Sequence, residues 1–526
     1  MTIIRIGDGS TARHSAETVG AKAANLARMA ALGLPVPPAF VLPIPLGVAF
    51  AKDDDHAKKE LASGLSEGLA FLENATGKKF GDRRNPLLVS VRSGAARSMP
   101  GMLDTVLNVG CSLSVVRALV RATGNPRFAW DCRRRFLESF GGVVLGLRAS
   151  AFARALAAAM TAEGVQDTDD LDSEATERLA VRYRQAIEGE DCALPEDPME
   201  QLTCAAQAVY RSWTSERART YRKLQHLESL AGTAVTIQAM VFGNRGSSSA
   251  AGVAFSRDPS TGAPQPVIEV LFDSQGEDVV SGGRTPDSED AITRRLPAAA
   301  AQLRQTLVRL EQEFADVQDV EFTIEDGKLW VLQTRSAKRT PRAALRFAID
   351  FVKEGRINPA EAVQVLKDLD LASLARARLT SVQVPAAQGI GASAGVAVGR
   401  AAFNAESARR LAASGEPVIL VRRDTSTADV AGFAVAAGIV TSKGGRTAHA
   451  ALVARQLAKP CIVGCASLIL DGHGCGAQLA GSPVREGDWL SIDGETGAIY
   501  LGRCEVSIER PEAELAELGR WRSEAA

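Results

Sequence analysis

The feature that most constrains the fold of this chain is a long helical block between two stretches that carry strand signals. From about residue 112 to residue 221, apolar residues recur at helical spacing, as in RFAWDCRRRFLESFGGVVL and EQLTCAAQAVYRSWTSERARTYRKL. A mixed segment precedes the block, and strand signals return after it. We therefore expect a helical insertion or subdomain within a larger α/β domain.

Short strands and one further helix are predicted on either side of this block. Residues 15–32 predict a single helix that ends at Gly33. After the block, β-branched and aromatic residues cluster or alternate between turn residues in five segments: 233–243, 250–258, 266–272, 318–327 and 328–335. The Glu-Asp-Gly at 325–327 predicts a hairpin turn between the last two.

The length and the later pattern predict several domains. A chain of 526 residues is too long for one ordinary core. Residues 341–387 predict a helical linker. From residue 388 to 505, short strands alternate with glycine turns and one clear helix, as in a compact β/α domain. We expect an α/β multidomain chain with a first domain at 1–340 and a solvated, charged helical tail at 506–526.

Composition excludes several classes of partner. The net charge is -1, so the basic excess that nucleic-acid or anionic-membrane partners favour is missing. The first residues lack a signal segment, and no apolar run approaches the roughly 18 residues that a membrane span needs. We expect a cytoplasmic protein without a nucleic-acid or membrane partner. The eight cysteines are scattered, which favours reduced thiols. Three of them cluster with a histidine, at Cys461, Cys465, His473 and Cys475. A zinc site is the alternative there, although the spacing matches no paired Cys-x-x-Cys pattern.

Two segments carry the residue types that phosphoryl transfer requires. Arg92 leaves a predicted strand and enters a loop of small residues at 93–101, whose N–H groups could approach a phosphate. The alternative is an ordinary glycine-containing turn that binds no ligand. In the predicted hairpin, Asp319 and Glu321 share one strand face at i and i+2, and a glutamine and an arginine repeat this spacing on the next strand. The alternative is an ordinary solvent-facing side of the hairpin.

His449 is placed where a histidine could carry a phosphoryl group. It follows a predicted strand, the Gly444-Gly445 turn and Thr447, at the start of a helix whose inward residues we expect to be Leu452, Val453 and Leu457. Free N–H groups and the helix dipole would stabilise a phosphoryl group there. A neutral imidazole is a competent nucleophile near pH 7. Thr447 itself is interpreted as a helix cap, and a regulatory role for it is left open.

These segments resemble the pyruvate phosphate dikinase family along essentially the whole chain. VGAKAANLARMAALGLPVPPAF, SVRSG, SMPGMLDTVLN, GNPRFAWDCRRRF, TAVTIQAMVFGN, SQGEDVVSGGRTP and QDVEFTIEDGKLWVLQTR occur in family order. GGRTAHAALVARQLAKPCIVG resembles the family's phosphohistidine segment. The resemblance implies an ATP-grasp nucleotide-binding domain with a helical insertion, a helical linker and a swivelling phosphohistidine domain.

The resemblance also implies roles for particular residues. His449 would be phosphorylated, with Arg92 and Arg335 acting in catalysis. The nucleotide and its phosphates would be bound by Lys22, Arg92, Arg135, Gln238, Met240, Glu277, Gln333 and Arg335. Glu321, assisted by Asp319, would hold Mg²⁺. Two departures stand out: Ala251 replaces a threonine that contacts phosphate in the family, and Ala96-Arg97 reverses the family's usual arginine-alanine order.

Three functional readings remain open at the level of sequence. In the first, the chain converts ATP to AMP with inorganic phosphate as co-substrate, phosphorylates His449 and passes the group to a separate acceptor protein or barrel subunit. In the second, it is a catalytically impaired nucleotide-binding regulatory module. In the third, it is a truncated dikinase, because the family's pyruvate-binding barrel is not found in this sequence. The segment 341–380 is expected to act as a hinge for His449.

Overall fold

The computed structural model describes residues 3–97, 99, 103–165, 167–190, 192–281, 284–370, 374, 376–380, 384–425, 429–446, 448–471 and 476–525. Internal contacts divide the chain into two compact units. The first unit comprises 1–247 and 330–333, and the second comprises 248–329 and 334–526. This division is coarser than the predicted domain boundaries, which stay a prediction.

The first unit contains a five-stranded sheet in the order β1-β2-β7-β5-β6. Its strands are β1 (Ile4–Ile6), β2 (Ala39–Leu42), β5 (Val89–Ala95), β6 (Thr105–Val109) and β7 (Thr233–Ala239), and β3 (Lys79–Phe80) and β4 (Pro86–Leu87) form a separate pair. Four helices precede β5 in the chain: α1 (Ala16–Val19), α2 (Ala21–Ala31), α3 (Ile44–Phe50) and α4 (Asp55–Thr76). Every residue of β2 and β7 is buried, as expected for strands inside a core.

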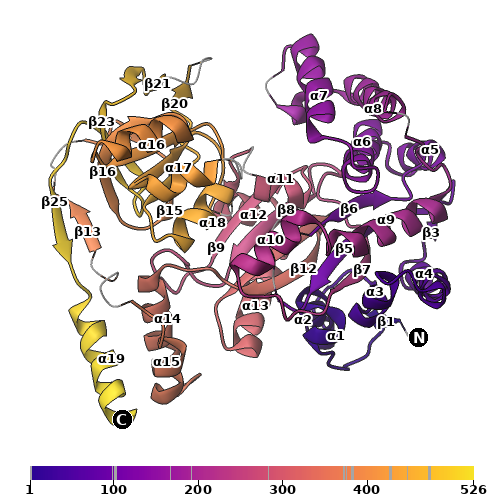
Figure 1. Ribbon diagram of the computed structural model, residues 1–526, viewed down its shortest axis with the longest axis horizontal. Coiled ribbons are helices and arrows are strands. Elements are labelled where there is room, and N and C mark those ends of the chain that lie inside the picture. The colour runs from indigo at the N-terminus through magenta and orange to yellow at the C-terminus, as the bar shows by residue number, and fades with distance from the viewer. Residues whose placement is uncertain are drawn as a thin grey trace. The chain divides into compact units, whose positions relative to one another are not determined.

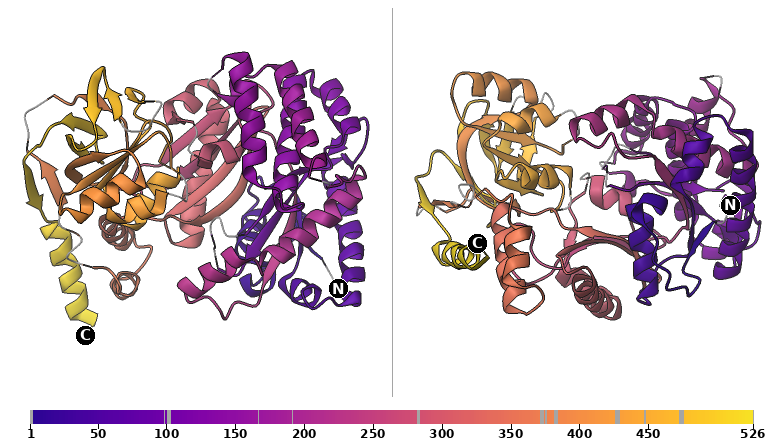
Figure 2. Two further views of the ribbon diagram at one scale, coloured as in Figure 1. Left: turned by 45° about the horizontal axis from the view of Figure 1, so that its top comes forward. Right: turned by 60° about the horizontal axis from the view of Figure 1, so that its bottom comes forward.

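The expected helical block is present between β6 and β7. It consists of α5 (Leu113–Thr123), α6 (Pro126–Val143), α7 (Ala149–Glu163), a 3₁₀ turn (Thr168–Asp170), α8 (Ser173–Glu188), α9 (Pro198–Ser212) and α10 (Glu216–Leu224). Figure 1 shows α6 next to α7 and α8, and the purple helices of the left view of Figure 2 lie side by side. Phe128, Phe136, Phe140 and Tyr183 are almost completely buried in this block. The block therefore shares one continuous apolar core with the sheet.

The second unit begins with a sheet in the order β10-β9-β8-β11-β12. Its elements are β8 (Ala250–Phe255), β9 (Val267–Phe272), α11 (Gly276–Ser281), β10 (Asp287–Ser288), α12 (Glu289–Arg295), α13 (Pro297–Phe314), β11 (Gln318–Glu325) and β12 (Lys328–Ser336). Residues 330–333 of β12 are counted with the first unit. The predicted hairpin turn is confirmed: Asp326 and Gly327 join β11 to β12 with φ of 49° and 81°. Two successive positive φ angles are the geometry that an Asp-Gly pair supplies.

The linker region and the C-terminal tail pack on one another, which differs from the expected solvated tail. The linker contains α14 (Pro341–Lys353), α15 (Pro359–Val365) and β13 (Arg376–Leu379), and the tail contains β25 (Val506–Glu509) and α19 (Glu512–Ala525). β13 pairs with β25, and Figure 1 shows α19 beside α14 and α15. Leu518 and Trp521 of α19 are buried against Leu345 and Ile349 of α14. Charged residues dominate the tail's composition, but these two apolar side chains decide its packing.

The remaining segment forms an eight-stranded mixed sheet in the order β14-β24-β23-β16-β17-β18-β19-β15. Its strands are β14 (Ala387–Gln388), β15 (Ile390–Ser393), β16 (Val396–Ala402), β17 (Val418–Arg422), β18 (Gly438–Thr441), β19 (Cys461–Val463), β23 (Trp489–Asp493) and β24 (Ala498–Leu501). The helices α16 (Ala405–Ala413), α17 (Val430–Val435) and α18 (His449–Gln456) pack on it, and β20 (Leu468–Leu470), β21 (Gly476–Leu479) and β22 (Ser482–Arg485) form a small meander. This is the compact β/α architecture expected for 388–505.

Candidate functional site

The first unit brings together the arginine of the small-residue loop and a glutamine of the neighbouring strand. Arg92 lies on β5, whose residues pair antiparallel with β7, and its Nη1 donates a hydrogen bond to Oε1 of Gln238 at 3.3 Å. Gln238 is buried, and its Nε2 donates to the carbonyl of Pro37 at 3.2 Å. Arg92 and Gln238, two of the residues predicted to bind the nucleotide, therefore lie side by side in the sheet.

The other predicted residues of this unit lie on separate elements. Lys22 is exposed on α2, and Met240 directly follows β7, where its backbone N–H donates to the carbonyl of Leu88 at 2.9 Å. Gln333 is buried in β12. Arg135 on α6 is nearly buried, and its Nε donates to Asp131 at 2.9 Å.

Asp131 is the centre of a buried charged cluster that sequence reasoning did not single out. It also accepts hydrogen bonds from Arg134, at 2.7 Å, and from Asn244, at 2.9 Å. Burial favours the neutral acid, but Arg135 and Arg134 outweigh it and hold the pKa of Asp131 well below its usual range. Arg135 is thus held in place by an ionised carboxylate.

In the second unit, the hairpin face predicted from the alternation contains an ion pair. Nε of Arg335 on β12 donates to Oδ2 of Asp319 on β11 at 2.8 Å, and Asp319 is only 2% exposed. Burial raises the pKa of Asp319, and Arg335 opposes this shift. Burial would lower the pKa of Arg335, but Asp319 and then Glu321 raise it overall. The solvent-facing interpretation of this face is therefore wrong for Asp319. Glu277 lies exposed on α11.

The carboxylates of β11 have the chemistry that Mg²⁺ requires. Oδ1 of Asp319 is buried and has no hydrogen-bond partner among the described residues, so one hard oxygen remains available. Glu321 lies two residues further on the same face, with partial exposure. Mg²⁺ commonly uses one or two carboxylates together with water and phosphate oxygens. The donor set therefore fits the implied ion.

His449 begins α18, directly after the loop that leaves β18. The loop is fixed by Arg446, whose backbone N–H donates to Glu269 of β9 and whose Nε donates to the carbonyl of Gly391 at 2.8 Å. Gly445 permits this approach, because a Cβ there would lie 2.7 Å from Oε2 of Glu269. Thr447, interpreted as a cap, lies outside the described residues; the N-cap position of α18 is Ala448.

The imidazole of His449 is partly buried and retains an unbonded nitrogen. Its Nε2 is buried and makes no hydrogen bond with the part of the chain that the structure describes. The ring lies edge-on to Phe433, with the centroids 6.2 Å apart and the planes at 82°. Burial lowers the pKa of His449, and the charge of Asp429 partly opposes the shift. The neutral, nucleophilic form is therefore favoured near pH 7.

The expected inward face of α18 is wrong for Leu457, whereas Val453 is partly buried and packs against the core as expected. Leu457 is 45% exposed, whereas the buried residues are Ala450, Ala451, Ala454 and Arg455. Small side chains let the helix lie close to the sheet. Arg455 is 1% exposed, and its guanidinium donates to the carbonyls of Ala392, at 2.8 Å, and Arg446, at 2.6 Å. In the sequence, the one indication that Arg455 fixes the loop is an arginine within an alanine-rich helix.

The departures from the family pattern and the cysteines can also be placed. Ala251 is completely buried in β8 and packs in an apolar cluster with Val253 and Leu271. The described cysteines are free thiols, and burial raises the pKa of Cys461 to about 12. His473 and Cys475, which the zinc alternative needs, lie outside the described residues.

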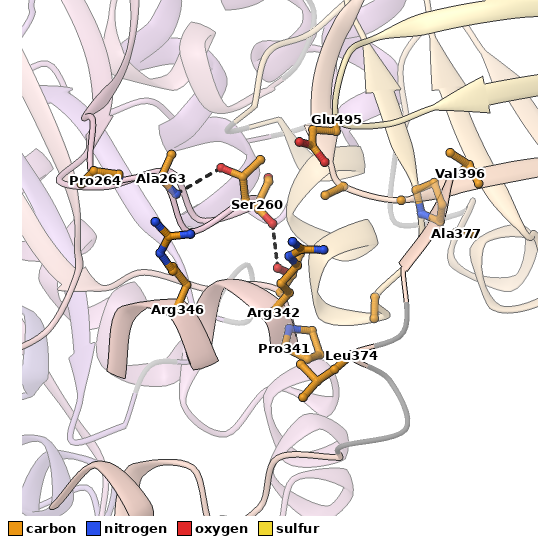
Figure 3. Close-up of a pocket in the computed structure, with 16 residues that line it drawn as sticks. Ser260, Ala263, Pro264, Pro341, Arg342, Arg346, Leu374, Ala377, Val396 and Glu495 are labelled. Atoms are coloured by element: carbon orange, nitrogen blue, oxygen red, sulfur yellow. Dashed lines mark hydrogen bonds between the residues drawn. The ribbon is translucent and has the colours of Figure 1, made fainter. Parts of the chain in front are cut away.

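A cavity of about 480 Å³ lies in the second unit away from the predicted chemistry. Figure 3 shows Arg342 and Arg346 extending from α14 on one side and Glu495 on the other. The hydroxyl of Thr340 donates to the carbonyl of Ser260 at 2.8 Å and closes part of the wall. No residue that we predicted for catalysis, nucleotide or metal lines this cavity.

Comparison with known proteins shows the class of protein that this fold and site define. Residues 56–298 and 289–355 match the model of the AMP/ATP-binding domain of pyruvate phosphate dikinase, and residues 414–497 match the mobile domain of PEP-utilising enzymes. A match to an AMP/ATP-binding domain is thus followed along the chain by a match to a mobile domain of PEP-utilising enzymes. The chain belongs to the pyruvate phosphate dikinase family.

Individual relatives agree with this assignment. The chain is 41% identical to the pyruvate, phosphate dikinase of Clostridium symbiosum over 93% of its own length and 56% of the relative. It is 40% identical to pyruvate, phosphate dikinase 2 of Zea mays, over 97% and 58%. It is 41% identical to the chloroplastic dikinase 1 of Arabidopsis thaliana, over 96% and 53%. The chain therefore spans a little over half of these relatives.

None of the described helices combines the length and the apolar character that a membrane span needs. The relatives include proteins named as chloroplastic. The cytoplasmic location of this chain stays a prediction.

Proposed function

We propose that this chain, with Mg²⁺, converts ATP to AMP by transferring the β-phosphoryl group to His449 and the γ-phosphoryl group to inorganic phosphate, which gives pyrophosphate. The phosphoryl group on His449 then passes to a separate acceptor protein or barrel subunit. The same half-reaction is expected if the chain acts as a piece of a longer dikinase. The observation that carries the proposal is His449 itself. A family-matched histidine starts a helix after a Gly-Gly turn and keeps Nε2 without a hydrogen bond among the described residues.

The nucleotide would be bound by an ATP-grasp fold. Arg92 and Lys22 would contact phosphates, and Gln238 and Met240 would lie at the adenine. Arg135, Glu277 and Gln333 would complete the nucleotide contacts. Arginine suits phosphate binding because its planar fork engages two oxygens and keeps its charge.

Arg335, Asp319 and Glu321 would handle the charge of the transferring phosphate. Mg²⁺ held by the two carboxylates would neutralise charge on the phosphate oxygens. Arg335 is positioned by its bond to Asp319, so its remaining N–H groups can act without reorganisation. The face of this hairpin therefore has the preorganisation that phosphoryl transfer requires.

Access to His449 requires a movement. Because Nε2 is buried, a phosphoryl group can reach it only after the surrounding residues separate. We propose that the segment 341–380, which contains α14 and α15, is the hinge for this movement.

A regulatory nucleotide-binding module is the second candidate. Ala251 favours it, because a buried methyl group cannot donate the hydrogen bond that the family's threonine supplies. Such a module would bind ATP and stay unphosphorylated.

The decisive experiment is the intact mass of the full chain after incubation with ATP, Mg²⁺ and phosphate. We expect a gain of one phosphoryl group that His449→Ala abolishes, with nucleotide affinity unchanged because the imidazole is not a nucleotide contact. His56→Ala is the matched control, because His56 is exposed on α4. Phosphorylation that persists in His449→Ala would exclude His449 as the acceptor, and no mass gain in the parent would favour the regulatory module.

A further inference from the structure

The short helix α17 is held at its C-terminal end by one lysine. Nζ of Lys459 donates hydrogen bonds to the carbonyls of Phe433 at 2.8 Å, Ala434 at 2.7 Å and Ala436 at 2.5 Å. An ammonium group has three protons, and these three carbonyls use all of them. Helix ends leave such carbonyls without intrahelical donors, so Lys459 satisfies the end of α17.

The end of α18 places Lys459 in this position. Ala458 adopts a left-handed φ of 51°, and the backbone N–H of Lys459 donates to the carbonyl of Ala454 at 2.9 Å. This tight turn ends α18 and precedes β19. Lys459 therefore ties the end of the helix that begins with His449 to the end of α17.

α17 in turn lies against the imidazole. Phe433 is completely buried, packs with Ala450 and Ala454 of α18, and lies nearly perpendicular to the imidazole of His449. A centroid distance of 6.2 Å is within the range of a favourable aromatic contact. Asp429, at the start of α17, forms an ion pair with Arg422, with Oδ1 of Asp429 at 3.1 Å from Nε of Arg422. The N-terminal end of the helix is therefore anchored as well.

We propose that Lys459 is a positioning residue for His449, because its hold on α17 fixes Phe433 against the imidazole. Lys459 does not touch the reacting atoms; it acts through Phe433. Loss of the ammonium group would leave three carbonyls without donors, and α17 would shift or fray. The imidazole would then gain freedom and water. This inference rests on the proposed function for its effect on rate, but its effect on the environment of His449 can be measured separately.

The test uses the full chain with Lys459→Met, which keeps an unbranched apolar stem and removes the ammonium group, and with Lys459→Arg, which keeps donors. We expect Lys459→Met to lower the rate of His449 phosphorylation by roughly 10- to 100-fold, as for a misplaced reacting group. Nucleotide affinity should be unchanged, and Lys459→Arg should recover part of the rate. Arg409→Met on the exposed face of α16 is the control for loss of a surface cation, and its rate should match the parent.

A second readout is the pKa of His449, measured by NMR and assigned with His449→Gln. In Lys459→Met it should rise from its depressed value toward about 6.5 as water reaches the ring. An unchanged pKa and rate, with only a lower melting temperature, would overturn the inference and leave Lys459 a structural cap. If the parent is never phosphorylated, the proposed function fails, but the pKa still decides this inference.

Where Lys459→Met does not fold, Phe433→Leu provides the same decision. This variant keeps the hydrogen bonds of Lys459 to the carbonyl groups of α17 and removes the aromatic ring beside the imidazole. The pKa of His449 should therefore rise as well. An unchanged pKa in that variant would show that Phe433 does not shape the environment of the imidazole, and the inference would fall.

Discussion

The proton on His449 is governed by two opposing influences. Partial burial disfavours the imidazolium, and the negative charge of Asp429 favours it; burial is the larger influence, so the pKa is lowered. The folded chain therefore binds a proton at this residue less readily than the unfolded chain does. Stability due to neutral His449 is complete above the unfolded pKa of about 6.5 and is lost as the pH falls through the lower folded value.

This sign predicts the pH dependence of phosphorylation. The rate should be constant above pH of about 6.5 and fall at lower pH, with a midpoint below that of a free imidazole. Initial rates of mass gain between mildly acidic and neutral pH would measure it, with nucleotide affinity followed in parallel. A midpoint at or above 6.5 would contradict the assignment.

Sequence reasoning was most successful where a residue's role follows from local periodicity. The i, i+2 spacing correctly placed Asp319 on the same hairpin as Arg335, and the strand-turn-helix pattern correctly placed His449 at a helix start. It could not show that Asp319 is buried. Nor could it show that Arg455 is buried, because its partners Ala392 and Arg446 come from other segments.

Among the elements, the first predicted helix differs from the structure in an informative way. The single helix expected at 15–32 is two helices, α1 and α2, separated by Gly20 with φ of 80°. A Cβ at Gly20 would lie 2.2 Å from the carbonyl oxygen of Gly94 on β5. The helix is broken because two backbones meet there, and apolar periodicity carries no information about such a contact.

Gly20→Ala should therefore destabilise the first unit strongly. We expect a loss of at least ~2 kcal/mol in the free energy of unfolding, from backbone strain of roughly 1–3 kcal/mol together with the clash. Gly33→Ala is the matched control: its φ is also positive, at 70°, but no atom lies within 4 Å of an added Cβ. Urea unfolding of both variants isolates the effect of the close approach. Equal losses would show that the clash relaxes without cost.

At the scale of the whole molecule, the sequence pattern predicts more domains than the two compact units that internal contacts define. The contacts give two compact units, and the tail expected to be solvated belongs to the core around α14, α15 and α19. Composition gave the wrong answer for the tail because a few apolar side chains, among them Leu518 and Trp521, are buried there.

Trp521→Ala should destabilise the second unit selectively. Truncation of a buried tryptophan costs about 3 kcal/mol or more, and Trp521 is 7% exposed. Because the chain divides into two compact units, we expect thermal unfolding to show two transitions, of which only one moves in this variant. Hydrogen exchange would assign that transition to α14 and α15. An unchanged curve would show that α19 contributes no stability there.

The eight-stranded sheet ends on β14 at one edge and β15 at the other, yet only Gly389 separates these two strands in the chain. Its N–H donates to the carbonyl of Gly497 at 2.9 Å, while an added Cβ would lie 3.0 Å from the carbonyl oxygen of Val463. One residue can join both edges only if the sheet curls back on itself. The two edge strands that meet at Gly389 are short, with 2 residues in β14 and 4 in β15, so they leave little backbone on which another chain could add a strand.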